Sequence, residues 1–378
     1  MHILIVARGC PNHEYPMNGI FEFDQAKALA SIGHKVSYLS IDTRSLRRKR
    51  SLGFRSFSKD GVDVFGIDLP LGRIPLRLER AIGIRASLAI AKKAVEINGA
   101  PDLVHGHFAT YGVYANELGS FFRIPSIYTE HCSLVLTGDE QYCAISQEAC
   151  QKADLTIAVS SALSSIVSSY SDTPVEIVWN IADADTFSNV HREHHDGYHF
   201  VSVGSLLPGK NHSLTINALS ILKRKNGEKA SLTIVGEGPE RKALEKEIKQ
   251  LDLENQVTLA GVLDRSSIAK LYAKADCFVL PSNFETFGVA YAEAMLAGLP
   301  VIATKCGGPE EFVVPQCGKL VQPKNIGQLT DAMKDMMENG PLDQTAIMSY
   351  ARSSFSPEAI ALKLTQLYAS ILTRQKFD

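Results

Sequence analysis

Two glutamates, Glu285 and Glu293, have seven residues between them and flank a glycine at the start of a predicted helix. The glycine, Gly288, is followed by a run rich in alanine, a residue that favours helices. The first amide groups of a helix, here those near Phe287, Gly288 and Val289, have no partner inside the helix and attract anions such as phosphate. Because Gly288 has no side chain, a phosphate can approach its backbone closely. The pattern therefore predicts an anion-binding helix start, with one carboxylate before it and another inside the helix.

Further residues in the second half of the chain suit a phosphate-bearing ligand. Gly307 and Gly308 form a second turn that exposes its backbone, just ahead of a helix start expected at Pro309. Lys210 lies in the loop after the strand expected at Phe200–Val203, where a lysine can pair with phosphate as a compact point charge. For any one of these residues alone, an exposed surface position is the simpler interpretation. Their combination favours a phosphate site.

Histidines follow two of the strands expected in the first half of the chain. His131 comes shortly after the strand expected at Ser126–Tyr128, and His105 and His107 lie at the end of another strand. Ligands usually bind at the carboxyl ends of parallel strands. An extended chain would place His105 and His107 on one face, but no third metal ligand is evident, so we expect no metal site. A histidine with a purely structural hydrogen bond is the alternative for His131.

Alternating strands and helices must position these residues. Ile3–Ala7 reads as a buried strand, Phe21–Ser31 as a helix and Val36–Ile41 as the next strand, which is the order of a Rossmann-like unit. Gly19 lies where the loop meets the helix, so its backbone can face a phosphate or an acceptor, with a simple turn as the alternative. The glycine fingerprint of dinucleotide-binding enzymes is absent, which argues against an NAD-dependent enzyme.

Positive charge is concentrated in one part of the chain. The formal net charge is −2, but residues 42–93 hold thirteen Lys or Arg against five Asp or Glu. The excess includes Arg44, Arg47, Arg48, Lys49, Arg50, Arg55, Arg73, Arg77, Arg80 and Arg85. Such a region suits an anionic membrane surface or a phosphate-bearing acceptor, and a solvated protein surface is the alternative. No nucleic-acid-binding motif accompanies the charge, so we expect no nucleic-acid partner.

The cysteines and the apolar runs indicate a compartment. The seven cysteines are scattered and form no C-x-x-C pair, which suits a reducing environment. The apolar run at the N-terminus is too short for a signal peptide, and no uninterrupted apolar stretch is long enough to span a bilayer. We therefore expect a cytoplasmic protein that can lie peripherally on the inner face of the cell membrane.

The motifs around the two glutamates resemble those of a known enzyme family. The stretch from Glu285 to Glu293 reads E-x-F-G-x-x-x-x-E, and A-G-x-P-V-I-A-T and G-G-P-E-E follow it. This series resembles the signature of the retaining nucleotide-sugar glycosyltransferases of family 4. The resemblance to that family extends over almost the whole chain. The resemblance implies an α/β protein of the GT-B fold, with two Rossmann-like domains that face each other across a cleft. We expect an N-terminal acceptor domain at 1–185, a C-terminal nucleotide-sugar-binding domain at 197–355 and a helix at 356–378 that crosses back to the first domain.

The resemblance also implies roles for individual residues. The catalytic residues would be Glu285, His131 and Lys210. The donor would be bound by Gly19, Ser205, Lys210, Gly236, Gly238, Val262, Phe287, Gly288, Val289, Glu293 and Gly308. In these roles Glu293 would bind the ribose hydroxyls, Glu285 the donor sugar, and Lys210 the leaving diphosphate. The nucleotide-sugar is a substrate, and neither a cofactor nor a metal ion is expected.

Two residues depart from the family pattern. Ser205 stands where an arginine usually binds the diphosphate, and Ile181 replaces a glycine of the segment that connects the domains. The resemblance implies transfer of a sugar from a UDP- or GDP-type donor to a glycan or lipid-linked acceptor, in cell-surface polysaccharide biosynthesis. Two alternatives stay open: a nucleotide-sugar 2-epimerase of the same fold, and a non-catalytic nucleotide-sugar-binding module, which the serine at position 205 favours. Two carboxylates also suit a glycoside hydrolase, but the phosphate-binding features favour transfer.

Overall fold

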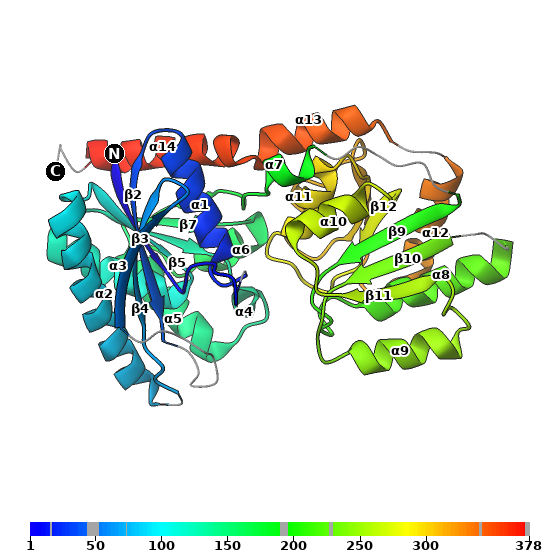
Figure 1. Ribbon diagram of the computed structural model, residues 1–378, viewed down its shortest axis with the longest axis horizontal. Helices are drawn as coiled ribbons and strands as arrows, with labels where there is room; N and C mark the ends of the chain where they lie inside the picture. The colour runs from blue at the N-terminus through cyan, green and yellow to red at the C-terminus, as the bar shows by residue number, and fades with distance from the viewer. Residues whose placement is uncertain are drawn as a thin grey trace. The chain divides into compact units, whose positions relative to one another are not determined.

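The chain forms two compact units, each built around one sheet (Figure 1). The computed structural model describes residues 1–15, 17–43, 53–72, 74–189, 196–226, 230–339 and 342–374. One unit consists of Met1–Ile181 together with Pro357–Asp378, and the other of Ala182–Ser356. Six residues of the basic region lie outside the described residues: Arg44, Arg47, Arg48, Lys49, Arg50 and Arg73.

Within the described residues, the first unit contains an eight-stranded sheet in the order β3-β4-β2-β1-β5-β6-β7-β8. Its strands are β1 (His2–Ala7), β2 (Lys35–Asp42), β3 (Gly53–Lys59), β4 (Val62–Asp68), β5 (Leu103–His107), β6 (Ser126–Glu130), β7 (Leu155–Ala158) and β8 (Val175–Ile177). Its helices are α1 (Ile20–Ser31), α2 (Leu76–Asn98), α3 (Ala109–Phe122), α4 (Ser133–Leu136), α5 (Glu140–Lys152), α6 (Ser161–Val167) and α14 (Pro357–Arg374). Neighbouring strands are parallel, except that β3 pairs with β4 in the antiparallel direction.

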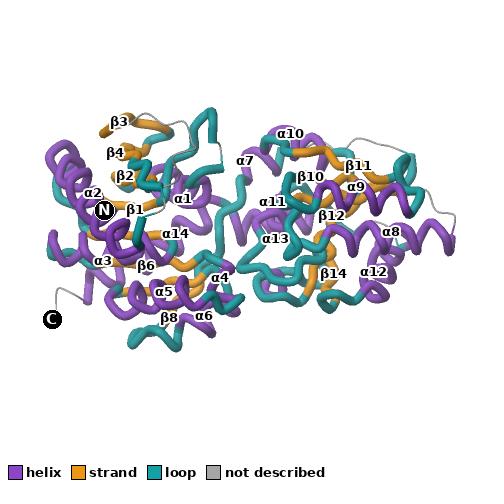
Figure 2. Tube along the Cα trace, turned by 90° about the horizontal axis from the view of Figure 1, so that it is seen from below, coloured by secondary structure: helices purple, strands orange, loops and turns teal. Residues whose placement is uncertain are grey.

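Central strand β1 is buried on both faces because helices cover both sides of the sheet. Ile3 and Ile5 belong to the apolar cluster that includes α1 and α14, whereas Leu4 and Val6 belong to the cluster that includes α2 and α3. This alternation follows from the two-residue period of a strand. Helix α14, the last of the chain, lies against α1 (Figure 1, Figure 2).

The second unit contains, in the part of the chain that is described, a six-stranded parallel sheet in the order β11-β10-β9-β12-β13-β14. Its strands are β9 (Tyr198–Val203), β10 (Ala230–Val235), β11 (Val257–Gly261), β12 (Cys277–Leu280), β13 (Val301–Thr304) and β14 (Gly318–Val321). Its helices are α7 (Ala184–Phe187), α8 (His212–Asn226), α9 (Arg241–Gln250), α10 (Arg265–Tyr272), α11 (Val289–Leu296), the 3-10 helix η1 (Pro309–Glu311), α12 (Ile326–Glu338) and α13 (Gln344–Phe355).

The expected fold class is confirmed, since both units are Rossmann-like α/β layers. Two local features differ from the sequence interpretation. Strand β3 is mostly exposed and carries no apolar alternation, so only the Asp60–Gly61 turn that joins it to β4 marks it in the sequence. The helix start expected at Pro309 gives only the three-residue η1. None of the helices that the structure describes has the length and apolar composition needed to cross a bilayer.

Candidate active site

The loops at the carboxyl edge of the second sheet carry most of the residues that the sequence nominates in this unit, and the other two, Val289 and Glu293, lie in α11, which follows one of these loops. Five strands that are adjacent in the sheet, β11, β10, β9, β12 and β13, each end in one of these loops. In that order the loops hold Val262; Gly236 and Gly238; Ser205 and Lys210; Glu285, Phe287 and Gly288; and Gly308. Ligands of open α/β sheets bind at this edge, so the topology places the nominated residues where a ligand is expected.

An ion pair joins two of these loops. Nζ of Lys210 lies 2.5 Å from Oε1 of Glu285, and the hydroxyl of Ser282 donates to the same oxygen at 2.8 Å. The backbone amide of Asn283 donates to the carbonyl of Gly209 at 2.8 Å and ties the same loops together. Glu285 is 7% exposed, whereas the Lys210 side chain is 27% exposed. The carboxylate therefore fixes the lysine in place, and the ammonium group stays accessible to an anion.

The start of helix α11 is closely packed at its two neighbouring glycines, Gly288 and Gly308. Gly288 has φ +95°, and a Cβ atom there would lie 2.6 Å from the ring of Tyr291. A Cβ atom on Gly308 would lie 2.4 Å from Cα of Phe287, and the amide of Gly308 donates to the carbonyl of Glu285 at 2.9 Å. Both positions therefore require glycine. The side chain of Phe287 is buried, so its contribution to a site would come from its backbone.

Glu293 belongs to a separate group of charges that the sequence interpretation missed. Nε of Arg265, in α10, lies 3.6 Å from Oε1 of Glu293, and a terminal nitrogen of Arg265 lies 3.7 Å from Oδ2 of Asp183. Asp183 also caps α7 by accepting from the amide of Thr186. Glu293 is 8% exposed. Arg265 thus places a positive charge beside the carboxylate of Glu293. An arginine directly after the predicted β11 loop is the sequence signal that indicates a charged residue at this edge of the sheet.

The glycines of the β10 loop have a structural explanation. A Cβ atom on Gly236 would lie 1.9 Å from the carbonyl oxygen of Gly204, and one on Gly238 would lie 2.4 Å from that of Leu206. The loops after β9 and β10 therefore touch through their backbones. Ser205 lies at this contact with an exposed side chain. The close approach alone accounts for glycine at both positions.

Val262 comes directly after β11, in the loop next to the β10 loop. A hydrogen bond joins the two loops, because the amide of Gly236 donates to the carbonyl of Gly261 at 2.8 Å. The Val262 side chain is 72% exposed. An apolar side chain this exposed beside backbone turns can cover the flat face of a planar ligand, and nothing inside the described part of the unit packs it away.

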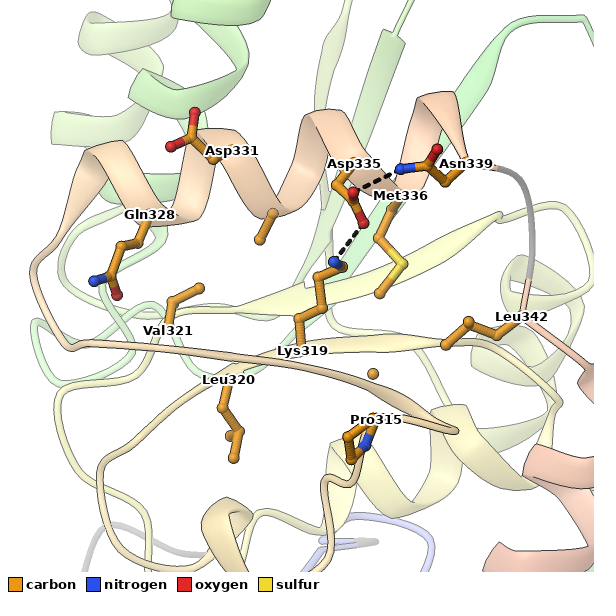
Figure 3. A pocket seen from close by; sticks show the side chains of 12 residues that line it. Pro315, Lys319, Leu320, Val321, Gln328, Asp331, Asp335, Met336, Asn339 and Leu342 are labelled. Carbon is orange, nitrogen blue, oxygen red and sulfur yellow. Dashed lines mark hydrogen bonds and ion pairs between the residues drawn. The ribbon is translucent and has the colours of Figure 1, made fainter.

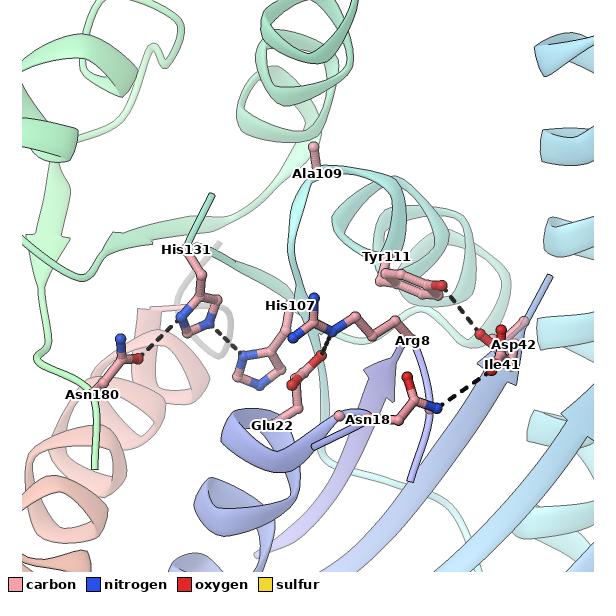
Figure 4. A network of polar contacts seen from close by, with 12 residues as sticks. Arg8, Asn18, Glu22, Ile41, Asp42, His107, Ala109, Tyr111, His131 and Asn180 are labelled. Carbon is pink, nitrogen blue, oxygen red and sulfur yellow. Dashed lines mark hydrogen bonds and ion pairs between the residues drawn. The ribbon is translucent and has the colours of Figure 1, made fainter. Parts of the chain in front are cut away.

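In the first unit, a chain of hydrogen bonds links two histidines (Figure 4). Nδ1 of His131 donates to Oδ1 of Asn180 at 3.1 Å, so Nε2 of His131 is left to accept from Nδ1 of His107 at 2.9 Å. Both ring nitrogens of His131 are thus engaged inside the unit. A sugar hydroxyl can reach a ring nitrogen of His131 only by replacing Asn180 or His107.

The two histidines are neutral at pH 7. Burial, and after it the positive charge of Arg8, lowers the pKa of His131 to about 3. Burial is also the main cause that holds the pKa of His107 well below its usual range. Neutral imidazoles can exchange hydrogen bonds with hydroxyl groups, but they bring no positive charge to a diphosphate.

Arg8 is a further residue at this edge of the first sheet that the sequence interpretation did not nominate. It follows β1 directly, and its Nε lies 3.0 Å from Oε1 of the fully buried Glu22 in α1. Its guanidinium group also lies over the ring of Phe108, with Cζ 4.3 Å from the ring centre. A charged residue that follows a buried strand without a break is the sequence signal for such a position.

Gly19 is the N-cap residue of α1, at the same edge (Figure 4 labels its neighbour Asn18). The side-chain amide of Asn18 donates to Oδ2 of Asp42 at 3.3 Å. Gly19 thus lies at the start of a helix, as the sequence predicts, and the loop before it is fixed to the end of β2.

Of the two histidines in β5, His105 uses both ring nitrogens in hydrogen bonds within the first unit. Nδ1 of His105 is 2.7 Å from the hydroxyl of Tyr368 in α14, and Nε2 is 2.7 Å from that of Thr129. Both nitrogens are therefore occupied. Among the described residues, no group of three or more His, Cys, Asp or Glu side chains is arranged to hold a metal ion.

A pocket of about 660 Å³ lies elsewhere in the second unit, between the edge strand β14 and helix α12 (Figure 3). Lys319 and Asp335 form an ion pair across it. Its lining contains none of the residues that the sequence nominates. We therefore place the candidate site at the carboxyl edge of the sheet and not in this pocket.

Comparison with known proteins identifies the class to which this fold and site belong. Group 1 of the glycosyl transferases matches residues 183–353, and glycosyltransferase family 4 matches residues 23–186. The structure is similar to that of sucrose-phosphate synthase from Thermosynechococcus elongatus, with a TM-score of 0.78, 21% identity and coverage of 99% of each chain. The chain belongs to glycosyltransferase family 4 and has the GT-B fold.

Two curated relatives show the range of reactions in the family. The chain is 26% identical over 301 residues to the glycogen synthase of Mycobacterium tuberculosis. The aligned residues cover 75% of this chain and 72% of that protein. It is 33% identical over 199 residues to an N-acetylgalactosamine-N,N'-diacetylbacillosaminyl-diphospho-undecaprenol 4-alpha-N-acetylgalactosaminyltransferase of Campylobacter jejuni, over 50% of this chain and 53% of that protein. The chain is thus a nucleotide-sugar glycosyltransferase.

Proposed function

We propose that this enzyme is a retaining transferase that moves a sugar from a UDP- or GDP-type donor to a glycan or lipid-linked acceptor during cell-surface polysaccharide biosynthesis. The observation that carries the proposal is the Lys210–Glu285 ion pair beside the start of α11. In the proposal, the second unit holds the nucleotide-sugar and the first unit holds the acceptor. The Campylobacter relative, whose name specifies a diphospho-undecaprenol-linked acceptor, supports the lipid-linked alternative.

The residues of the second unit divide the work on the donor. Lys210 and the backbone amides at the start of α11 stabilise the negative charge that grows on the leaving diphosphate. Both described contacts of the Glu285 side chain use Oε1, which leaves Oε2 to accept from a hydroxyl of the donor sugar. Glu293, which lies beside Arg265, accepts from the two ribose hydroxyls. No step in this scheme needs a metal ion, because the lysine and the amides supply the positive charge.

In the first unit, the neutral histidines act on hydroxyl groups. Nε2 of His107 is buried and has no hydrogen-bond partner within the described part of the chain. In the hydrogen bonds that run from Asn180 through His131, Nδ1 of His107 carries the proton. Nε2 of the neutral His107 ring therefore has a lone pair and can accept from a hydroxyl. A sugar hydroxyl that reaches His107 or His131 would complete the chain of hydrogen bonds. We assign these residues to binding of sugar hydroxyls and not to the neutralisation of phosphate.

Analysis of products with and without acceptor tests the reaction type. The protein is incubated with UDP- and GDP-sugars in EDTA, alone and with a polyprenyl-diphosphate sugar or a glycan. We expect free nucleoside diphosphate and an extended acceptor, with the anomeric configuration of the donor kept. An epimerised donor sugar without acceptor would identify the 2-epimerase alternative. Donor binding without any new product would identify the non-catalytic module.

We also propose that the start of α2 approaches an anionic membrane surface. Leu76 and Leu78 are 42% and 56% exposed, and the exposed Arg77 lies between them. Not all the charge of this region is available, because Arg55 pairs with Asp68 and Arg80 pairs with Glu148. The proposal places the enzyme in the cytoplasm, peripherally on the inner face of the cell membrane.

Vesicle sedimentation tests this membrane proposal. The wild type is expected to sediment with vesicles that contain anionic lipid and to dissociate as salt is raised, because exposed charges are screened by salt. Arg77→Ala combined with Leu78→Ala should bind several-fold less, whereas Lys242→Ala in the second unit should bind like the wild type. Equal sedimentation of all three proteins, or none for the wild type, would reject the proposal.

A further inference from the structure

One oxygen of a buried carboxylate holds the end of strand β6 in place. Glu130 is fully buried, and its Oε1 accepts from the backbone amides of His131 and Cys132, both at 2.8 Å. The same oxygen accepts from the hydroxyl of Tyr142, in α5, at 3.1 Å. A carboxylate that accepts several amides fixes the backbone that carries them. The position of His131 therefore depends on Oε1 of Glu130.

The other oxygen of Glu130 faces a different set of donors. Oε2 accepts from the hydroxyl of Ser146 at 2.8 Å and from the hydroxyl of Tyr128. Ser146 lies in α5, and Tyr128 lies in the middle of β6. The donors to Oε1 thus include the backbone amide of His131, whereas neither donor to Oε2 belongs to His131 or to the residue after it. Helix α5 contributes one hydroxyl to each set.

Tyr142 connects this carboxylate to the strand that carries the other histidine. Its hydroxyl donates to Glu130 and also accepts from the backbone amide of Ala109 at 3.1 Å. Ala109 begins α3, two residues after His107. One hydroxyl group therefore joins the ends of β5 and β6, where the two linked histidines are found.

The backbone between His107 and Ala109 needs such a restraint. Phe108 has φ +66°, a conformation that non-glycine residues adopt rarely and at a cost of about 1–3 kcal/mol. It is held on one side by its own amide, which donates to the carbonyl of Thr129 at 2.9 Å. On the other side the Tyr142 hydroxyl holds Ala109. The ring of Phe108 lies against that of His131, with ring centres 5.0 Å apart.

We propose that Glu130 is a positioning residue for sugar transfer, and that it acts through Tyr142 to keep His107 and His131 in register with each other. The inference rests on the proposed function, in which these histidines bind sugar hydroxyls. Glu130 itself touches no substrate. Its effect passes through one hydroxyl to the strained Phe108 and through two amides to His131.

Two variants of α5 form a matched pair for the test. Tyr142→Phe removes the hydroxyl from the Oε1 side, and Ser146→Ala removes the hydroxyl from the Oε2 side. Each takes one donor from the same carboxylate, so a purely structural role of Glu130 would affect both variants alike. Only Tyr142→Phe frees Ala109 and lets Phe108 relax.

Steady-state kinetics with a transferable donor provide the first measurement. Tyr142→Phe is expected to lower kcat about tenfold to a hundredfold, the loss that small misplacements of binding groups cause. The KM for the donor should stay within about twofold of the wild type, because the donor is assigned to the second unit. Ser146→Ala should keep the kcat of the wild type at a similar loss of thermal stability. Equal kcat values in the two variants would overturn the positioning role.

Nitrogen NMR of the histidine rings gives a second measurement that does not need activity. The signals of His107 and His131 should shift in Tyr142→Phe and stay in place in Ser146→Ala. If the wild type transfers no sugar, the proposed function fails, but the signals still decide the inference. Unchanged histidine signals in Tyr142→Phe would reject it.

Discussion

Replacing Lys210 with alanine is expected to lower the turnover number about a hundredfold to a thousandfold, the loss typical of removing one group that stabilises transition-state charge. The lysine contributes a fixed positive charge, because Glu285 and the neighbouring loop hold it in place. The protein should stay folded, since the side chain is 27% exposed and leaves no cavity in the core. Initial rates at saturating donor, together with thermal unfolding, provide the measurement.

Two further variants separate the role of the ion pair from a general effect of charge. Glu285→Gln keeps the shape of the side chain and should also lose most of the activity. The double variant should lose less than the product of the two single losses, because residues in contact are not independent. Lys334→Ala, on the exposed face of α12, should behave like the wild type. Full activity in Lys210→Ala would contradict the assignment of the diphosphate to this loop.

Replacing Glu293 with alanine is expected to weaken binding of the nucleotide more than tenfold. A hydrogen bond to a charged group contributes about 1.5–3 kcal/mol, and about 1.4 kcal/mol corresponds to a factor of ten in affinity. In the proposal the carboxylate accepts from two ribose hydroxyls, so both interactions are lost together. Titration calorimetry with the nucleoside diphosphate measures the change.

The Glu293→Ala variant is expected to keep the fold of α11. Alanine favours helices more than glutamate does, and Arg265 retains Asp183 as a partner in the variant. Glu338→Ala, at an exposed position of α12, removes the same charge away from the site. If Glu293→Ala binds nucleotide as tightly as Glu338→Ala does, Glu293 does not contact the ribose.

Features of the structure that depend on residues close together in the sequence could be predicted from the sequence. The start of α11 was predictable because Gly288 and the alanine-rich run after it are local signals for a helix start and a close backbone approach. The sheet of the second unit was predictable for a similar reason, since its buried parallel strands read as continuous apolar runs. The functional roles of Glu285, Glu293 and Lys210 stay predictions.

Contacts between distant residues were beyond the sequence. The position of Arg265 after the β11 loop indicates the edge of the sheet, but not that this arginine lies 3.6 Å from the carboxylate of Glu293, twenty-eight residues later. The expectation for His131 also left out that Asn180 and His107 occupy its two ring nitrogens. Such pairings depend on how strands are ordered in a sheet, and periodicity of one segment does not contain that information.

Glycine positions show a second limit of sequence interpretation. Gly236 was nominated as a donor-binding residue, but its contact with the Gly204 carbonyl is enough to require glycine there. A glycine that approaches a ligand and a glycine that approaches another loop give the same signal in a sequence. Only the structure separates the two causes, and at the β10 loop it favours the packing explanation.

The most direct test of the donor site is thermal unfolding of the wild type and of Glu293→Ala with UDP, GDP and ADP. A ligand at a hundred times its dissociation constant stabilises the folded state by about 2.7 kcal/mol. We predict that one of the three nucleotides raises the unfolding temperature of the wild type and that the variant shows no comparable rise at the same concentration. An equal rise in both proteins, or no rise in the wild type with any nucleotide, would contradict a nucleotide site at Glu293.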